Sequence, residues 1–175
     1  MSAGIAEHRV RIVPGTISTD DIIPGRYKHM YTDPRDMAPH VFESLLPGFA
    51  ASLRAGDALC CPDIFGIGSS REQAVSSLVA AGVTAIFARR FGRIFFRNAW
   101  NLGLPALELR EADLVEGEPI TVDLERGSIR RATGALTFEP PPDEMLRMLR
   151  AGGLLASVAA RFAAGGRAPG STSAA

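Results

Sequence analysis

Cysteine is scarce in this sequence. Only two of the 175 residues are cysteines, and they stand side by side as Cys60 and Cys61. Disulfide frameworks, zinc sites and iron–sulfur sites need cysteines that are spaced along the chain, so this adjacent pair favours none of them. Because the pair lies inside an apolar run, we interpret both as strand residues, and we expect no metal or cofactor to be bound by this chain.

Long apolar runs and an excess of charge of one sign are also missing. No uninterrupted apolar stretch approaches the roughly 18 to 20 residues that span a bilayer. Residues 1–11 lack the basic start and the long apolar stretch of a signal peptide, so we expect a cytoplasmic protein without a membrane partner. Lys+Arg and Asp+Glu are equal at 19 each, which disfavours nucleic acid as the main partner.

The remaining composition is ordinary for a globular protein, with 46% hydrophobic and 22% charged residues. A chain of 175 residues fits a single domain. We predict one domain over residues 1–162. Residues 163–175 are rich in Ala, Gly, Ser and Pro, and we expect this tail to be disordered.

Strand-like and helix-like segments alternate along the chain, which predicts an α/β fold. Strands are expected at residues 8–13, 58–61, 83–88 and 104–109. Helices are expected at residues 40–46, 74–79, 92–103 and 142–162, the last with a break at Gly152 and Gly153. A hairpin is expected from residues 119–124 and 128–138, turning at Arg126 and Gly127. Gly82 is well placed to end the helix of the first β-α-β unit, whose two strands are expected to be parallel.

The strongest local feature is a glycine loop at residues 66–72, which read Gly-Ile-Gly-Ser-Ser-Arg-Glu. Glycines let backbone approach a ligand, and the helix that follows presents unpaired N–H groups with a partial positive charge. The loop is therefore expected to bind an anion. The alternative is local, because Ser69 with Glu72 has the spacing of a capping box that only starts a helix. Ser70 with Gln73 has the same spacing.

Arg71 favours the binding interpretation over the local one. Its planar, permanently charged guanidinium stands beside two serine hydroxyls and free amides, a combination suited to a carboxylate or a phosphate. The spacing is not that of a nucleotide P-loop, and no third glycine completes a dinucleotide fingerprint. The expected ligand is therefore an acid.

Three segments of the sequence carry a resemblance to a known family. They are residues 18–24 (Ser-Thr-Asp-Asp-Ile-Ile-Pro), residues 65–74 (Phe-Gly-Ile-Gly-Ser-Ser-Arg-Glu-Gln-Ala) and residues 91–105 (Phe-Gly-Arg-Ile-Phe-Phe-Arg-Asn-Ala-Trp-Asn-Leu-Gly-Leu-Pro). In this order and spacing they resemble the small subunits of 3-isopropylmalate dehydratases and related enzymes of the aconitase family. The later residues 151–155, Ala-Gly-Gly-Leu-Leu, resemble the C-terminal segment of the same family.

The resemblance implies a swivelling β/β/α domain that closes over a large partner subunit. That subunit is expected to hold a [4Fe-4S] cluster, which acts as a Lewis acid on the hydroxyl and a carboxylate of a small hydroxy acid. The implied reaction is the removal and re-addition of water, as in the isomerisation of 2-isopropylmalate and 3-isopropylmalate in leucine biosynthesis. Neither subunit is expected to catalyse alone.

The resemblance also implies roles for the residues of the glycine loop. Ser69 is expected to be the catalytic base that removes a proton from the carbon next to a carboxylate, while Ser70 and Arg71 bind a substrate carboxylate. A serine is a weak base in water. It would need an alkoxide stabilised by the helix N-terminus and by a cationic interface that excludes water.

Four further residues are expected to support this site. Thr19 and Asp20 match the family's Thr-Asp pair, which supports the active-site arginines by hydrogen bonds. The local alternative for this pair is an Asx-type turn. Gly66 and Gly68 are the glycines of the loop and are expected to let backbone approach the ligand.

The loop that begins at Arg26, Tyr27 and Lys28 is implied to contact the variable side chain of the substrate. Its sequence has neither the apolar pair of isopropylmalate enzymes nor the arginine of enzymes for longer tricarboxylates, although Lys28 can pair with a third carboxylate. Gln73 and Ile67 replace a histidine and a cysteine that are common in the family. Isopropylmalate is the leading substrate, with homoaconitate-type and methylmalate-type acids as alternatives. A second alternative is a non-catalytic, carboxylate-binding assembly module.

The other polar and aromatic groups give weaker signals. His8, His29 and His40 lack metal-ligand spacing and are interpreted as solvated or hydrogen-bonded side chains. A basic cluster can face the partner subunit or solvent, and it consists of Arg89, Arg90, Arg93 and Arg97. Three neighbouring aromatic residues are interpreted as core or interface, namely Phe95, Phe96 and Trp100.

Overall fold

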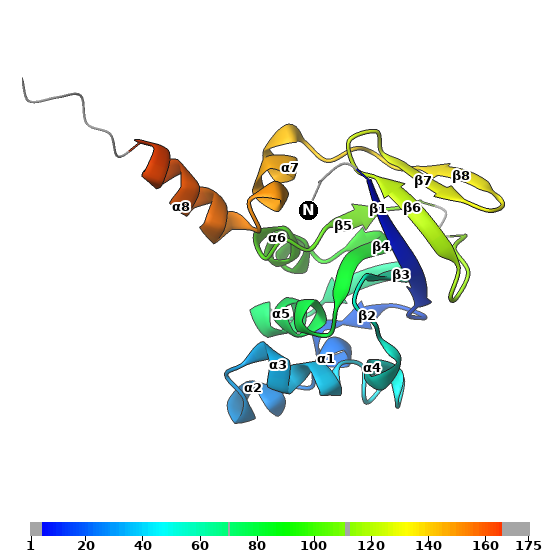
Figure 1. The fold of residues 1–175 in the computed structure, drawn as a ribbon. Helices are drawn as coiled ribbons and strands as arrows, with labels where there is room; N and C mark the ends of the chain where they lie inside the picture. The colour runs from blue at the N-terminus through cyan, green and yellow to red at the C-terminus, as the bar shows by residue number, and fades with distance from the viewer. Residues whose placement is uncertain (1–4, 70, 111–112, 166–175) are drawn as a thin grey trace, which may run out of the picture.

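The computed structural model describes residues 5–69, 71–110 and 113–165. Its centre is an eight-stranded mixed sheet with the order β5-β4-β3-β1-β6-β7-β8, and β2 pairs with β3 outside this path. The strands are β1 (Ile5–Ile12), β2 (Ile17–Ser18), β3 (Asp57–Ile67), β4 (Val83–Phe91), β5 (Ala106–Glu108), β6 (Pro119–Asp123), β7 (Ser128–Arg131) and β8 (Gly134–Thr137). Strands β5, β4, β3 and β1 run parallel, and β6 to β8 continue the sheet antiparallel (Figure 1).

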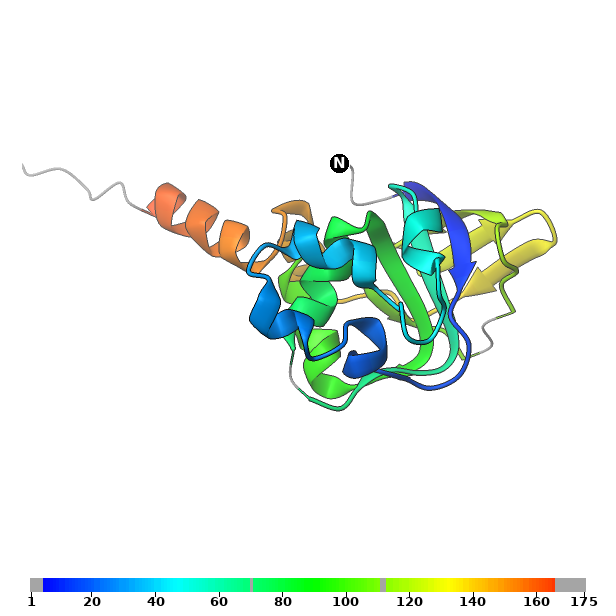
Figure 2. The same cartoon turned by 90° about the horizontal axis from the view of Figure 1, so that it is seen from below.

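Helices fill the connections between the parallel strands. Helix α5 (Glu72–Ala80) crosses from β3 to β4, and α6 (Arg93–Asn101) crosses from β4 to β5. These two helices contact each other on one side of the sheet, as Figure 1 shows. The long connection from β2 to β3 forms a separate group of short helices: α1 (Thr19–Ile22), α2 (Tyr27–Met30), α3 (Pro34–Met37), the 3-10 turn Ala38–His40 and α4 (Phe49–Ser52). Figure 2 shows this group beside α5.

Two helices follow the antiparallel strands. Helix α7 (Asp143–Arg150) lies close to α6, and α8 (Leu154–Gly165) extends away from the body of the molecule in both views (Figures 1 and 2). The break between them falls at Gly152 and Gly153, both of which have positive φ. The expected interruption of the last helical segment is therefore confirmed.

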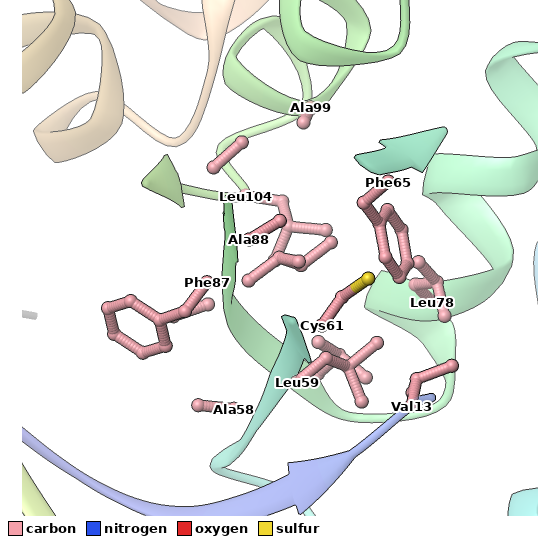
Figure 3. Packing of buried hydrophobic residues seen from close by; sticks show 14 of the residues in the cluster. Val13, Ala58, Leu59, Cys61, Phe65, Leu78, Phe87, Ala88, Ala99 and Leu104 are labelled. Carbon is pink, nitrogen blue, oxygen red and sulfur yellow. The ribbon is translucent and has the colours of Figure 1, made fainter. Parts of the chain in front are cut away.

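The central parts of β3 and β4 are buried because their residues are apolar on both faces. Figure 3 shows Cys61 of β3 projecting among the side chains of Phe65 and Leu78, where α5 covers the sheet. Phe87 of β4 packs edge-to-face against Phe138, with the ring centroids 6.5 Å apart. Burial of such side chains contributes roughly 1.5–3 kcal/mol each, so the continuous apolar runs that predicted these strands also hold the sheet together.

The sequence-based α/β prediction is confirmed, including the β-α-β unit. Strands β3 and β4 pair in parallel, and Gly82 follows α5 with a φ of +92°. A Cβ on Gly82 would lie 3.0 Å from backbone atoms of Ala55, which adds a packing reason for glycine at this position. Cys60 and Cys61 are buried strand residues, as expected.

Two local predictions are wrong. Residues 40–46 form turns rather than a helix, because Phe42 has a φ of +58° and its N–H donates to Ile22 O at 2.9 Å. The expected second strand at residues 128–138 is divided into β7 and β8 by a turn, so the hairpin is a three-stranded meander.

The chain end also differs in part from expectation. Helix α8 continues to Gly165, so residues 163–165 of the expected tail are helical. The rest of that prediction falls on residues 166–175, which lie outside the described residues.

Candidate active site

The glycine loop leaves the carboxyl end of β3 and leads into α5. In sheets of this kind ligands bind beside the carboxyl ends of the parallel strands, and Ser69 lies in the loop that leaves this edge. Ser69 is exposed, whereas Ser70 falls outside the described residues, so its expected place beside Ser69 stays a prediction. The edge therefore offers one described hydroxyl group to a ligand.

The loop's first glycine is required by packing. Gly66 has a φ of +77°, and a Cβ added to it would lie 2.2 Å from Cγ of the buried Phe95. Gly92 approaches equally closely, since its Cβ would lie 2.2 Å from Gly66 O. These contacts seat the start of α6 directly on the loop. Gly68 has a φ of +97° and lies in the exposed part of the loop, where a side chain would be strained.

The local interpretation of Ser69 as a helix cap does not hold. Helix α5 begins after Arg71, whose extended backbone makes it the N-cap residue, and no side-chain hydrogen bond caps the helix there. The alternative interpretation, a capping box of Ser69 with Glu72, is therefore wrong. Its counterpart with Ser70 falls outside the described residues. The first turn of α5 keeps N–H groups and a partial positive charge that can serve a ligand.

Arg71 is held by α1, which comes from a distant part of the sequence. Its Nη1 and Nη2 donate to Oδ1 and Oδ2 of Asp20, the second at 3.0 Å, and Nη1 also lies 3.4 Å from Ile23 O. The Arg71 side chain is only 16% exposed, whereas that of Asp20 is 60% exposed. The guanidinium is thus fixed in orientation by Asp20.

Thr19 connects the same helix to the glycine loop. Its side chain is buried, and Oγ1 donates to Ser69 O at 3.1 Å. Helix α1 itself is closed by a capping box in which Ser18 and Asp21 bond each other reciprocally. This arrangement replaces the Asx-type turn considered from the sequence. Asp20 is therefore free to bind Arg71. The structure thus brings together four of the predicted site residues, namely Thr19, Asp20, Ser69 and Arg71.

Arg26 does not join this group. Arg26 pairs with Glu43 instead. The preceding residue, Gly25, lies next to the Arg71 guanidinium, since a Cβ on Gly25 would be 3.4 Å from Arg71 Nη2. Lys28 lies in α2, and its side chain is outside the described part of the structure. Gly25 and Glu43 were missed by sequence reasoning. Only the Pro24-Gly25 turn signal before the loop could have drawn attention to the first of them.

The cysteines of this chain do not suit an iron–sulfur cluster. Burial, and then the neighbouring Cys61 and Glu118, raise the pKa of Cys60 to about 12. Burial also raises the pKa of Cys61, whose Sγ donates to Gly15 O at 3.0 Å. Within the described residues no three His, Cys, Asp or Glu side chains gather closely enough to hold a metal ion. In the same part of the chain, no helix has the length and apolarity to cross a membrane.

The basic cluster lies next to the glycine loop. Arg89 and Arg90 are exposed at the carboxyl end of β4, and Arg93 and Arg97 are exposed on α6. None of the four forms an ion pair with a described residue. The expected core role of the neighbouring aromatics holds for Phe95 and Trp100, which are buried, while Phe96 is half-buried.

The mixed sheet, with the serine–arginine loop at its carboxyl edge, is that of a domain of the aconitase class. The family model described as the aconitase C-terminal domain matches residues 57–112, which run from β3 past β5. A crystal structure of a 3-isopropylmalate dehydratase from Methanocaldococcus jannaschii has the same fold, with a TM-score of 0.87 and 32% identity over 93% of this chain and 98% of that chain.

Curated relatives narrow the class. The 3-isopropylmalate dehydratase small subunit of Wolinella succinogenes is 42% identical over 85% of this chain and 90% of its own length. The small subunit from Nautilia profundicola is 46% identical over 79% of this chain and 85% of its own length. A methanogen homoaconitase small subunit from Methanothermobacter thermautotrophicus is 42% identical over 87% and 89%. The chain belongs to the family of aconitase-type dehydratase small subunits, and the resemblance carried by its three motifs is confirmed.

Proposed function

We propose that this chain is the small subunit of a 3-isopropylmalate dehydratase, which interconverts 2-isopropylmalate and 3-isopropylmalate in leucine biosynthesis. The observation that carries the proposal is the joint placement of Ser69 and Arg71 by α1, at the uncapped start of α5. Relatives with this printed name match most of the chain.

Arg71 is proposed to bind a substrate carboxylate. A guanidinium has five N–H donors, so the pairing with Asp20 leaves donors for a second carboxylate. Because Asp20 fixes the plane of the guanidinium, the substrate finds a preoriented fork rather than a mobile cation. Ser70 is proposed to share this carboxylate, with Gly66 and Gly68 shaping the loop beneath it.

Ser69 is proposed to move the proton. Its alkoxide takes the proton from the carbon next to a carboxylate, a carbon–carbon double bond forms, and hydroxide leaves the neighbouring carbon. Hydroxide then adds to the other carbon, while Ser69 gives its proton to the carbon that had lost the hydroxyl and becomes an alkoxide again. The hydrogen bond from Thr19 to the backbone of Ser69 positions this residue beside the helix N-terminus, which favours the alkoxide.

The large subunit is proposed to complete the site. This chain's buried cysteines do not fit a [4Fe-4S] cluster, so we assign the cluster to the large subunit. Closure of the swivelling domain onto that subunit would exclude water from Ser69, which explains why neither subunit is expected to act alone. Arg93 and Arg97, which form no ion pair within the described part of the chain, favour an acidic docking partner. On composition, we place the complex in the cytoplasm.

The test is an anaerobic assay of this chain mixed with its large subunit, offering isopropylmalate, homoaconitate-type and methylmalate-type acids in parallel. Turnover of isopropylmalate only when both subunits are present is the expected result. Ser69→Ala should lower kcat by about a hundredfold or more, the range for loss of a general base, while complex formation is retained. Full activity of Ser69→Ala in an intact complex would support the carboxylate-binding module instead.

A homoaconitase subunit is the second candidate. The similarity to the methanogen homoaconitase small subunit favours it, together with a cationic residue, Lys28, on the loop proposed to meet the variable part of the substrate. Preferred turnover of a tricarboxylic acid, lost in Lys28→Leu, would select this candidate.

A further inference from the structure

One carboxylate gathers the polar groups behind the substrate loop. The hydroxyl of Tyr27 lies 2.9 Å from Oε1 and 2.8 Å from Oε2 of Glu43. His40 Nδ1 lies 2.9 Å from Oε2, and Nη2 of Arg26 donates to Oε1. Burial by itself would raise the pKa of Glu43, but the hydrogen bonds from Tyr27 and His40 and the charge of Arg26 outweigh it and lower that pKa. Glu43 is thus held as an anion.

The backbone before Glu43 explains its placement. Phe42 is, among the described residues, the non-glycine residue with positive φ, a conformation that bulky side chains seldom adopt. It is kept there because its ring is fully buried and packs edge-to-face against Phe49, while its N–H donates to Ile22 O at 2.9 Å. The core therefore fixes the direction in which the chain presents Glu43.

Stacked rings hold the other side of the cluster. Tyr27 and His40 stack with their centroids 4.1 Å apart, and Tyr31 stacks on both at 5.9 Å. These rings tie α2 to the turn that carries Glu43. The stacked rings therefore hold Glu43 in place, and Glu43 in turn holds Arg26.

Arg26 is close to the proposed carboxylate site but is turned away from it. Gly25, the preceding residue, approaches Arg71 and Asp20, whereas the Arg26 guanidinium bonds Glu43 and lies over the Tyr27 ring at 4.8 Å. The Arg26 side chain is 58% exposed and that of Glu43 is 25% exposed. Glu43 thus takes the Nη2 donor of Arg26 and places a negative charge beside the guanidinium, so a substrate carboxylate at Arg26 would be repelled by Glu43.

We propose that Glu43 is a specificity-determining residue, which keeps Arg26 from an additional substrate carboxylate and so favours acids with an apolar side chain. The inference rests on the proposed function, because it concerns the acid that this site accepts. An isopropyl group leaves the Arg26–Glu43 pair intact. A third carboxylate at the same place must either displace Glu43, which Tyr27 and His40 also hold, or face its negative charge.

The experiment measures kcat/KM for isopropylmalate and for a homoaconitate-type tricarboxylate with the complete two-subunit enzyme. Glu43→Gln retains an acceptor for Tyr27 but removes the charge that holds Arg26. We expect the ratio of tricarboxylate to isopropylmalate kcat/KM to rise about tenfold, as for one released charge-assisted hydrogen bond. The double variant Arg26→Gln, Glu43→Gln should return the ratio to that of the wild type.

Two controls separate specificity from loosened structure. Glu144→Gln removes the same charge from an ion pair with Arg147 on α7 and should leave the ratio unchanged. Tyr27→Phe removes the tyrosine hydroxyl from Glu43 but keeps the Arg26–Glu43 pair, so the ratio should stay within about twofold of the wild-type ratio. Thermal unfolding of each complex shows whether the variants are folded.

An unchanged ratio in folded Glu43→Gln, or a raised ratio that persists in the double variant, would overturn the inference. The proposed function fails differently, through absence of turnover of every acid by the wild-type complex. In that case the dissociation constants of the two acids from the complex are measured by calorimetry, and their ratio in Glu43→Gln is compared with that in the wild type.

Discussion

Arg71 and Asp20 are 51 positions apart in the sequence, yet both terminal nitrogens of the guanidinium meet both oxygens of the carboxylate. The pair joins the start of α5 to α1. Asp20 is mostly exposed and Arg71 mostly covered, so the pair contributes little to stability for its own sake. Its value lies in the direction it imposes on the guanidinium.

Replacement of Arg71 by lysine tests that direction. An ammonium group keeps the charge but cannot make two parallel hydrogen bonds, so we expect Arg71→Lys to raise KM by about tenfold or more. Asp20→Asn should raise KM less, because the guanidinium remains but is less firmly oriented. Steady-state kinetics of the two-subunit enzyme provide the measurement, and unchanged kinetics in Arg71→Lys would remove Arg71 from the site.

The packing of Gly66 against Phe95 is tested with a glycine of equal backbone geometry. Gly66 and Gly15 both have a φ of +77°, but a Cβ on Gly15 would meet nothing within 4 Å. Gly15→Ala should cost about 1–2 kcal/mol, the penalty of the left-handed backbone alone. Gly66→Ala should cost at least about 2 kcal/mol more, because overpacking is added. Equal losses in urea unfolding would show that Phe95 moves aside freely.

The basic cluster is tested through assembly. If Arg93 and Arg97 face an acidic partner, the double replacement by alanine should weaken binding of the large subunit and reduce the dependence of affinity on salt. We expect the dissociation constant to rise about tenfold at low ionic strength. Arg130→Ala is the matched control, since Arg130 is exposed on β7, across the sheet. Equal affinity of both variants by calorimetry would place the cluster in solvent.

A half-buried histidine, His8, makes stability depend on pH. Burial lowers the pKa of His8 below its ordinary 6.5, more than its hydrogen bond to Gly56 O raises it. At pH values above the pKa of His8 in the unfolded chain, the ring is neutral in both states and the full stability is present. As the pH falls from the unfolded pKa towards the lower folded pKa, the unfolded chain takes up the proton first, and stability is lost over this interval.

We therefore expect the free energy of unfolding to decrease as the pH falls below about 6.5. His8→Gln should flatten this part of the curve, whereas the same change at the exposed His29 should not. Urea unfolding at a series of pH values is the measurement. A curve for His8→Gln parallel to that of the wild type would contradict the assignment to His8.

Much of the fold was determined by local sequence. Continuous apolar runs predicted β3 and β4, helical spacing predicted α5 and α6, and the glycines at 82, 152 and 153 marked helix ends. These signals are readable because periodicity and backbone freedom act within a few residues. The glycine loop and its arginine were identified for the same reason.

Tertiary contacts decided the rest. Residues 40–46 had a helical composition, but burial of the Phe42 ring and its hydrogen bond to Ile22 outweighed that preference. Likewise, no spacing along the chain indicates that Asp20 binds Arg71 or that Glu43 holds Arg26. The sequence by itself determined which groups are present and which segments are strands or helices. Only the folded chain decided which charges meet, because ion pairs between distant segments depend on how the sheet and helices pack.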